Sequence, residues 1–199
     1  MSISLVAGLG NPGREYAGTR HNLGWVLIEA LASRQKLAWR SAPRFQAQVA
    51  RWDDGPGRTR WLIKPLTFMN DSGGPLRAFA DFHQVPASAV AVVHDDLALD
   101  LGRAKVSVGG SAGGHHGVAS VVDRLGDGFV RYRLGIGPRQ PPQMDLKDFV
   151  LGKFTPERLT FLNQQLDSHL HGLVLLLEGG VAQAMNTLNR RDKNESDQT

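Results

Sequence analysis

Gly8-Leu9-Gly10-Asn11-Pro12-Gly13 follows an apolar segment, residues 3–7, that is typical of a β-strand, and this strand and loop decide how the fold begins. The three glycines match the G-x-G-x-x-G pattern of dinucleotide-binding folds, in which the loop opens directly into a helix that holds a pyrophosphate. Here the apolar period of a helix begins only at Leu23, and Pro12 has no backbone N–H. The pattern therefore disfavours a dinucleotide site and leaves His21 just before the helix.

Strand-like and helix-like segments alternate along the rest of the chain. This order predicts an α/β fold with a single domain, a mixed and largely parallel central sheet, and helices on both faces. Strands are expected at residues 3–7, 46–52, 60–63, 89–93, 104–108 and 132–136, and helices at 22–37, 73–83, 116–125 and 156–177. The domain is expected to span residues 1–189, and residues 190–199 are expected to form a polar, disordered tail.

The composition narrows the class of protein. The 199 residues are 41% hydrophobic and 21% charged, which is ordinary for a globular domain. The chain has no cysteine, so disulfides, zinc-thiolate sites and a thiol nucleophile are excluded. No apolar run approaches the length of a membrane span, and we expect a cytoplasmic protein. The net charge of +4 favours an anionic partner such as nucleic acid.

Two side chains are suited to acid–base chemistry. His21 lies where the backbone N–H groups of a helix start disfavour the imidazolium ion, so the ring stays neutral and basic. Asp95 follows the very apolar segment 89–93 and is expected at the carboxyl end of a buried strand. A carboxylate there could accept the other ring proton of His21 and stabilise the cation formed when His21 takes a proton from water. Each residue taken alone is more simply explained as structural, His21 as a residue at a helix start and Asp95 as one that closes a strand into a turn.

A second hydrolase pattern competes with this pair. Gly109-Gly110-Ser111-Ala112-Gly113 matches the G-x-S-x-G motif, in which a sharp turn between strand and helix exposes a serine nucleophile. The glycines here predict a longer and looser loop. The histidine partner would have to be His169 or His171, both within a predicted helix. A serine hydrolase that uses Ser111 therefore remains a minor alternative.

The histidines do not have the spacing of metal ligands. His115 and His116 are adjacent, and His169 and His171 lie two positions apart on a predicted helix. Neither spacing brings two ligands to one face, and no H-E-x-x-H motif is present. The sequence therefore predicts no metal site.

Several ordered motifs together give the sequence a family resemblance. They are Gly8-Leu9-Gly10-Asn11-Pro12-Gly13, Tyr16, Thr19-Arg20-His21-Asn22, Thr67-Phe68-Met69-Asn70-Asp71-Ser72-Gly73, His94-Asp95-Asp96-Leu97, Gly113-Gly114-His115-His116-Gly117 and Phe149-Val150-Leu151-Gly152. Through these motifs the chain resembles bacterial peptidyl-tRNA hydrolases from residue 3 to about residue 189. The resemblance implies a monomeric enzyme, without cofactor or metal, that cleaves the ester between a peptide and the 3′ end of its tRNA after translation has stalled.

The resemblance also implies roles for individual residues. His21 would be the general base, Asp95 would orient it, and Asn11 would help to distinguish a blocked amino group from a free one. Amide and hydroxyl donors of the substrate site would offset charge that develops on the oxyanion. The side chains implied to line that site are Tyr16, Phe68, Asn70 and His116, and those implied to clamp the 5′-phosphate of the tRNA are Lys105 and Arg133.

The chain departs from the family pattern at two positions. His116 replaces the usual asparagine, and we expect activity to fall as His116 becomes protonated. Ser107 replaces a lysine that commonly supports the phosphate clamp, which predicts weaker and less salt-sensitive binding of the tRNA end. These departures keep a further alternative open, an RNA-binding paralogue of the same fold with weakened catalysis.

Overall fold

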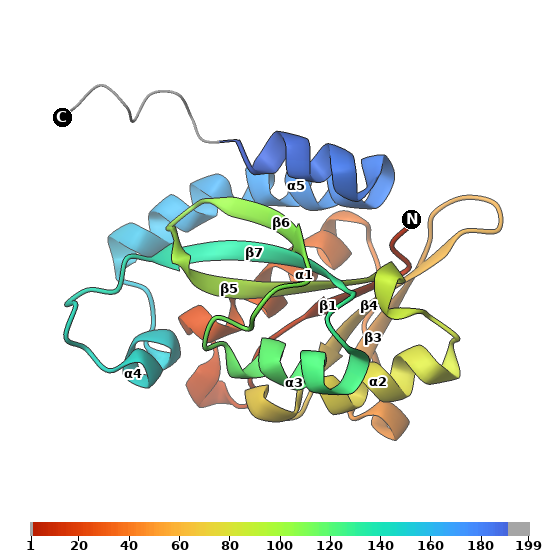
Figure 1. The fold of residues 1–199 in the computed structure, drawn as a ribbon, viewed down its shortest axis with the longest axis horizontal. Helices are drawn as coiled ribbons and strands as arrows, with labels where there is room; N and C mark the ends of the chain where they lie inside the picture. Colours follow the sequence, from red (N-terminus) through yellow and green to blue (C-terminus); the bar gives the residue numbers. More distant parts are fainter. Residues whose placement is uncertain (1, 191–199) are drawn as a thin grey trace.

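A computed structural model describes residues 2–190 of the chain as an α/β fold around one seven-stranded sheet (Figure 1). The order of the strands across the sheet is β2-β3-β4-β1-β5-β7-β6. The four neighbouring strands β4, β1, β5 and β7 are mutually parallel, whereas β2, β3 and β6 pair antiparallel at the two sides. The strands are β1 (Leu5–Gly8), β2 (Arg40–Ala42), β3 (Ala47–Asp53), β4 (Thr59–Pro65), β5 (Val90–Asp100), β6 (Ala104–Val108) and β7 (Val130–Gly137). The predicted mixed, largely parallel sheet is confirmed.

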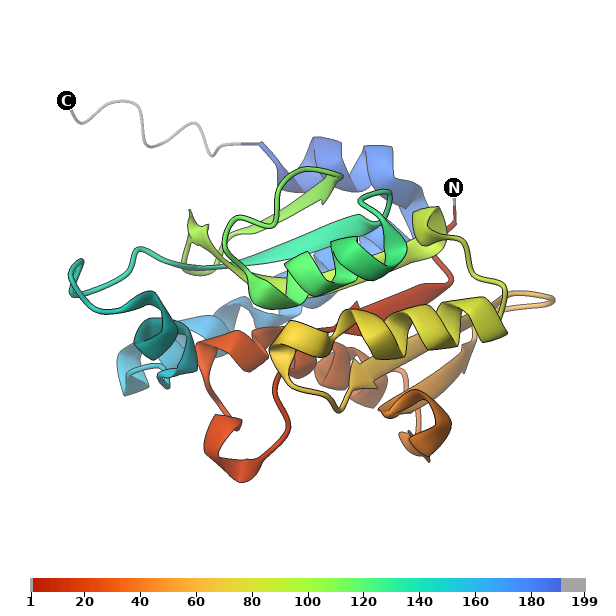
Figure 2. The ribbon, with the colours of Figure 1, turned by 60° about the horizontal axis from the view of Figure 1, so that its bottom comes forward.

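Helices cover both faces of the sheet, as predicted (Figures 1 and 2). On one face α1 (Leu23–Arg34) and α5 (Pro156–Leu188) cover a core that includes Val6, Leu27 and Leu173. On the other face α2 (Gly73–Phe82) and α3 (His116–Leu125) pack side by side over a second core. Alternate strand residues therefore supply two separate apolar layers.

The amino-terminal end of α1, which follows His21, packs closely on the sheet because position 24 is a glycine. A Cβ at Gly24 would lie 2.7 Å from the backbone nitrogen of Leu9 and closer still to the carbonyl oxygen of Val93. Real Cβ atoms do not approach other atoms so closely, so only glycine allows this contact between α1, β1 and β5.

Four elements differ from the sequence prediction. The short strand β2 and the six-residue helix α4 (Leu146–Leu151) were not predicted, because neither is long enough to show an apolar period. Strand β5 continues to Asp100, so Asp95 lies inside the strand rather than at its end. Helix α5 continues beyond the predicted end at residue 177 to Leu188, with a kink where Gly180 has φ 81°.

The carboxyl-terminal tail expected at residues 190–199 lies, apart from residue 190, outside the described part of the chain. Within residues 2–190, no helix combines the length and the apolar character needed to cross a lipid bilayer.

Candidate active site

A cavity of about 1070 Å³ opens where the parallel strands end. Loops after β1, β4 and β6 form part of its wall, and residues of strands β5, β6 and β7 and of helix α4 also line it. Parallel sheets place ligand sites at this edge. The side chains that the sequence analysis expected to converge there, and that do line the cavity, are Asn11, His21, Phe68, Asn70, Asp95, His116 and Arg133.

Asp95 accepts hydrogen bonds from two histidines at the same oxygen. Its Oδ1 lies 2.9 Å from Nδ1 of His21 and 3.0 Å from Nε2 of His115. The two imidazole rings lie 4.6 Å apart, centroid to centroid. His21 belongs to a short 3-10 turn, η2 (Arg20–Asn22), that leads directly into α1. The predicted contact between His21 and Asp95 is thus present, although the residues are 74 positions apart.

The surrounding contacts fix the proton positions of both rings. Nδ1 of His115 accepts hydrogen bonds from the backbone N–H groups of Gly117 and Val118, at 3.1 and 3.2 Å, and so caps α3. Its proton must therefore lie on Nε2, which donates to Asp95. His21 likewise donates from Nδ1 to the carboxylate, and its Nε2 keeps a free lone pair. A neutral His21 in this tautomer can accept a proton from water.

The environment keeps Asp95 ionised. Burial alone would raise the pKa of Asp95, but His115 and His21, through their charge and hydrogen bonds, hold the pKa well below its ordinary value of 3.8. The carboxylate therefore remains an anion behind His21 throughout the neutral and mildly acidic range.

The same three side chains also have the spacing of a metal site. Ligand atoms of His21, Asp95 and His115 lie within 4.8 Å of one another. However, His115 already uses the lone pair of Nδ1 to accept two backbone N–H groups, so its Nε2 carries the proton and cannot coordinate a cation. The hydrogen bonds favour a proton-transfer site over a metal site.

Asn11 joins the loop after β1 to the loop after β4. Its side-chain oxygen accepts the backbone N–H of Met69 at 2.7 Å, so the group it can offer to a ligand is its Nδ2–H₂. Its backbone N–H and C=O both bond to the side-chain amide of Asn22, at 2.8 and 3.0 Å. Asn22 is at the N-cap position of α1, but its side chain makes no cap bond there and instead holds Asn11.

The other predicted substrate-site residues lie around the mouth of the cavity. Phe68 is 59% exposed, and its ring meets that of Tyr16 edge to face with a centroid distance of 6.2 Å. Tyr16 itself is not among the lining residues. Asn70 and His116 are exposed and line the wall, His116 as the first residue of α3. The expected effect of His116 protonation stays a prediction.

Basic residues occupy the wall formed by β6 and β7. Lys105 is directly opposite Arg133 in the antiparallel pair, and Ser107 is opposite Arg131, so all four side chains share one face of the sheet. The predicted juxtaposition of Lys105 and Arg133 is confirmed. Arg133 also donates from Nε to Asp96 at 2.7 Å. The carboxylate of Asp96 therefore balances part of the repulsion between the positive charges of Lys105 and Arg133, even without a bound anion.

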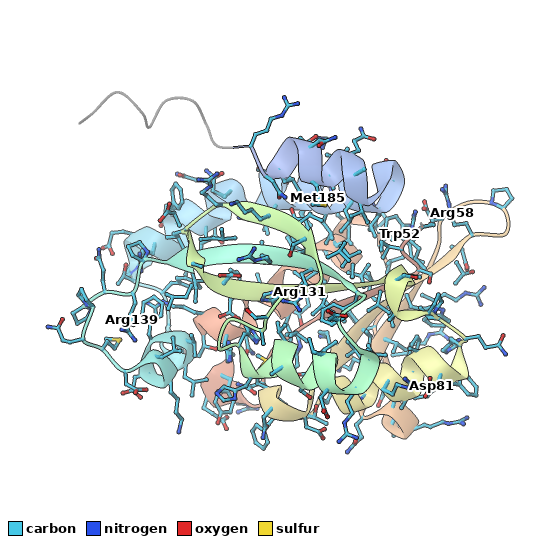
Figure 3. The ribbon with its side chains drawn as sticks, viewed as in Figure 1. Trp52, Arg58, Asp81, Arg131, Arg139 and Met185 are labelled. Atoms are coloured by element: carbon cyan, nitrogen blue, oxygen red, sulfur yellow. The ribbon has the colours of Figure 1, made fainter. Side chains whose placement is uncertain are left out.

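Two residues of this site were missed from the sequence. His115 was considered only with its neighbour His116 as a metal pair, although its place before the predicted α3 is a capping position. Arg131 lies between the sheet and α3 (Figure 3), where its two Nη groups donate to the carbonyls of Ser111 and Gly110 at 2.6 and 2.5 Å. No pattern in the sequence indicated that this buried guanidinium holds the glycine loop.

The geometry gives Ser111 no histidine partner of the predicted kind. Ser111 lies in the loop between β6 and α3 and lines the cavity. His169 and His171 both belong to α5, which covers the opposite face of the sheet. His169 is buried between α5 and the core, and His171 is exposed. The structure therefore separates Ser111 from both histidines that the elbow pattern required.

His94, next to the buried carboxylate of Asp95, is expected to make the fold sensitive to acid. Its ring is buried, its Nδ1 donates to the backbone oxygen of Asp95 at 2.7 Å, and burial, together with the nearby His115, lowers the pKa of His94 to about 3. Below pH 6.5 the unfolded chain binds a proton that the folded chain refuses. Stability should therefore fall as the pH drops from 6.5 towards 3, by up to about 1.4 kcal/mol per pH unit from this group.

Urea unfolding of the wild type and of His94→Asn at pH 7, 5 and 4 measures this effect. Asparagine keeps a donor for the Asp95 carbonyl but does not titrate, so the difference between the two proteins should shrink or reverse as the pH falls. Parallel stability curves would contradict the assignment.

The fold and the cavity define the class of the protein: an α/β protein with a histidine hydrogen-bonded to a buried aspartate at the carboxyl edge of a parallel sheet. The chain belongs to the peptidyl-tRNA hydrolase family, whose model, described as Peptidyl-tRNA hydrolase, matches residues 5–196.

Individual relatives agree with this membership. The peptidyl-tRNA hydrolase of Gloeobacter violaceus is 41% identical over 192 residues, with 96% of each chain covered. That of Anaeromyxobacter sp. (strain K) is 43% identical over 192 residues, which cover 96% of this chain and 98% of the relative. The crystal structure of peptidyl-tRNA hydrolase from Acinetobacter baumannii superimposes with a TM-score of 0.87 at 36% identity and covers 96% of both chains. The resemblance seen in the sequence motifs is confirmed.

Proposed function

We propose that the chain hydrolyses the ester bond of peptidyl-tRNA by activating water with His21. The observation that carries this proposal is the hydrogen bond from Nδ1 of His21 to the buried Asp95, which leaves Nε2 as an acceptor at the cavity. Family membership supplies the substrate class. The enzyme is proposed to act as a monomer in the cytoplasm and to recycle tRNA from stalled translation.

The proposed reaction moves one proton through His21. As the water oxygen attacks the ester carbonyl, the water gives a proton to Nε2, and the carboxylate of Asp95 stabilises the imidazolium ion. The C–O bond to the ribose then breaks, and the 3′ oxygen leaves with the proton from His21. The products are a peptide acid and a tRNA with a free 3′ end.

Polar groups around the cavity would stabilise the charge that develops on the carbonyl oxygen. The Nδ2–H₂ of Asn11 and the side-chain amide of Asn70 are candidate donors, because both residues line the cavity. Lys105 and Arg133 form a basic wall beside it, which suits the phosphates of the tRNA end, whereas both Nη groups of the buried Arg131 are bonded to carbonyls of the glycine loop. These roles are proposed from position and chemistry.

Turnover of a tRNA charged with an N-blocked amino acid tests the proposed function. The wild type should release the blocked amino acid, and a free aminoacyl-tRNA should be hydrolysed much more slowly. Binding of the blocked substrate without turnover would instead favour the RNA-binding paralogue. Covalent labelling of Ser111 by a fluorophosphonate would revive the serine hydrolase.

Ser107→Lys should make tRNA binding tighter and more sensitive to salt. Ser107 lines the cavity opposite Arg131, so a lysine there would add a cation to the basic wall. Each added phosphate contact steepens the slope of log K against log salt concentration by about 0.7–0.9. Binding of deacylated tRNA, measured between about 50 and 200 mM salt, gives the slope. Over this range of salt, each phosphate contact changes the affinity by about tenfold or less. Ser33→Lys, on the exposed side of α1, is the control, and equal slopes for both variants would count against a phosphate site at this wall.

A further inference from the structure

Arg20 precedes His21 in the same 3-10 turn but makes its contacts elsewhere. His21 lines the cavity, whereas Arg20 does not, and its side chain is buried against the segment that contains α4. Nη1 of Arg20 donates to the backbone oxygen of Phe149 at 2.9 Å. The guanidinium carbon lies 4.3 Å from the centroid of the Phe149 ring and 5.2 Å from that of Phe154. The Arg20 side chain thus contacts α4 and the segment after it through one hydrogen bond and two aromatic rings.

The backbone strengthens the same connection. The N–H of Arg20 donates to the carbonyl oxygen of Gly152 at 3.1 Å, and Thr19 forms an isolated antiparallel bridge with Lys153. Position 152 must be small, because a Cβ on Gly152 would lie 2.9 Å from Nη1 of Arg20. Figure 2 shows α4 beside the segment that leads into α1 and beside the first turns of α5.

Helix α4 is also a wall of the cavity. Phe149 points into the core and is completely buried, while Leu146, Val150 and Leu151 line the cavity. The same short helix therefore contacts Arg20 on one side and the substrate space on the other. The placement of this wall relative to His21 depends on the residue that immediately precedes His21.

The guanidinium is held without a carboxylate. None of the ion pairs within residues 2–190 involves Arg20. A buried cation that bonds only to a carbonyl and aromatic rings depends on the planar fork of arginine, which lysine cannot reproduce. A change of Arg20 to lysine should therefore release α4 although it conserves the charge.

We propose that Arg20 is a positioning residue that fixes helix α4, and with it the apolar wall of the cavity, relative to the base His21. This proposal rests on the proposed function for its kinetic consequence but not for its structural one. Loss of the charge-assisted bond should raise the exchange rates of the amides of Phe149 and Gly152 about tenfold. In kinetics the KM for N-blocked aminoacyl-tRNA should rise, and the acid limb of the pH profile should stay unchanged because His21 and Asp95 keep their contact.

Arg20→Lys tests the proposal, with Arg34→Lys as the matched control. Arg34 is an exposed arginine of α1 that pairs only with the exposed Asp167. Gly152→Ala is an independent variant, because its Cβ would displace the Arg20 side chain, and it should give the same local rise in exchange and in KM.

Three results would overturn the proposal. Unchanged exchange at Phe149 and Gly152 would show that α4 does not depend on Arg20. A uniform rise in exchange over the whole chain would show general destabilisation in place of local positioning. A shifted acid limb would show that Arg20 acts on His21 directly. If the wild type fails to turn over the blocked substrate, the proposed function fails, but the exchange measurement still decides whether Arg20 holds α4.

Discussion

His21→Ala is expected to lower kcat for N-blocked aminoacyl-tRNA by about 10²–10⁴-fold, with a much smaller change in KM. The imidazole is the group that takes the proton from water in the proposed mechanism, and the substrate is held mainly by other parts of the cavity. Steady-state hydrolysis, with binding of deacylated tRNA measured alongside, separates the two effects.

The matched control is His171→Ala, which removes an exposed histidine from α5. This variant should keep wild-type turnover. If His21→Ala retains more than about one tenth of wild-type kcat while it remains folded, an effect of at most 1.4 kcal/mol on the barrier, His21 is not the general base.

Asp95→Asn is expected to lower kcat by a similar factor, about 10²–10⁴-fold, although the shape of the side chain hardly changes. An amide oxygen could still accept a hydrogen bond from His21 or His115, but it carries no charge to stabilise the imidazolium ion. Because the pKa of Asp95 lies well below its ordinary value, the wild-type carboxylate is ionised throughout the neutral range, and the full loss should be seen at about pH 7 and above.

The double variant tests whether the two residues act together. If Asp95 acts only through His21, adding Asp95→Asn to His21→Ala should cost little further activity. Fully multiplicative losses would mean that Asp95 acts on the substrate by another route.

The stability of Asp95→Asn should also depend on pH in a defined direction. Because the pKa of Asp95 is lowered in the folded protein, the carboxylate contributes stability above the unfolded value of 3.8, and this contribution is lost as the pH falls further. The free energies of unfolding of the wild type and of Asp95→Asn should therefore converge in strong acid.

The architecture and the contact between His21 and Asp95 could be predicted from the sequence. The long strands and helices show clear apolar patterns, and parallel strands bring residues as distant as His21 and Asp95 to one edge. The short elements β2 and α4 could not be predicted, because three and six residues are too few to show a period.

The site contacts that the sequence did not predict have a common physical cause: polar side chains hydrogen-bond to tertiary partners that the local sequence does not specify. Asn22 bonds to Asn11 instead of capping α1, and Asp96 pairs with Arg133 across two strands. His115 bonds both to its own helix and to Asp95, a contact 20 positions away. A capping position is visible in sequence, but its second partner is not.

The glycine at position 24 has a consequence for the chemistry. The turn that carries the base is anchored to α1, and the carboxylate belongs to β5, so the gap across which they meet is set by how near that helix can come to the sheet. A single added methyl group there would act as a spacer between two layers of the molecule. In the proposed mechanism, the distance between the base and its carboxylate thus depends on the absence of a Cβ atom at position 24.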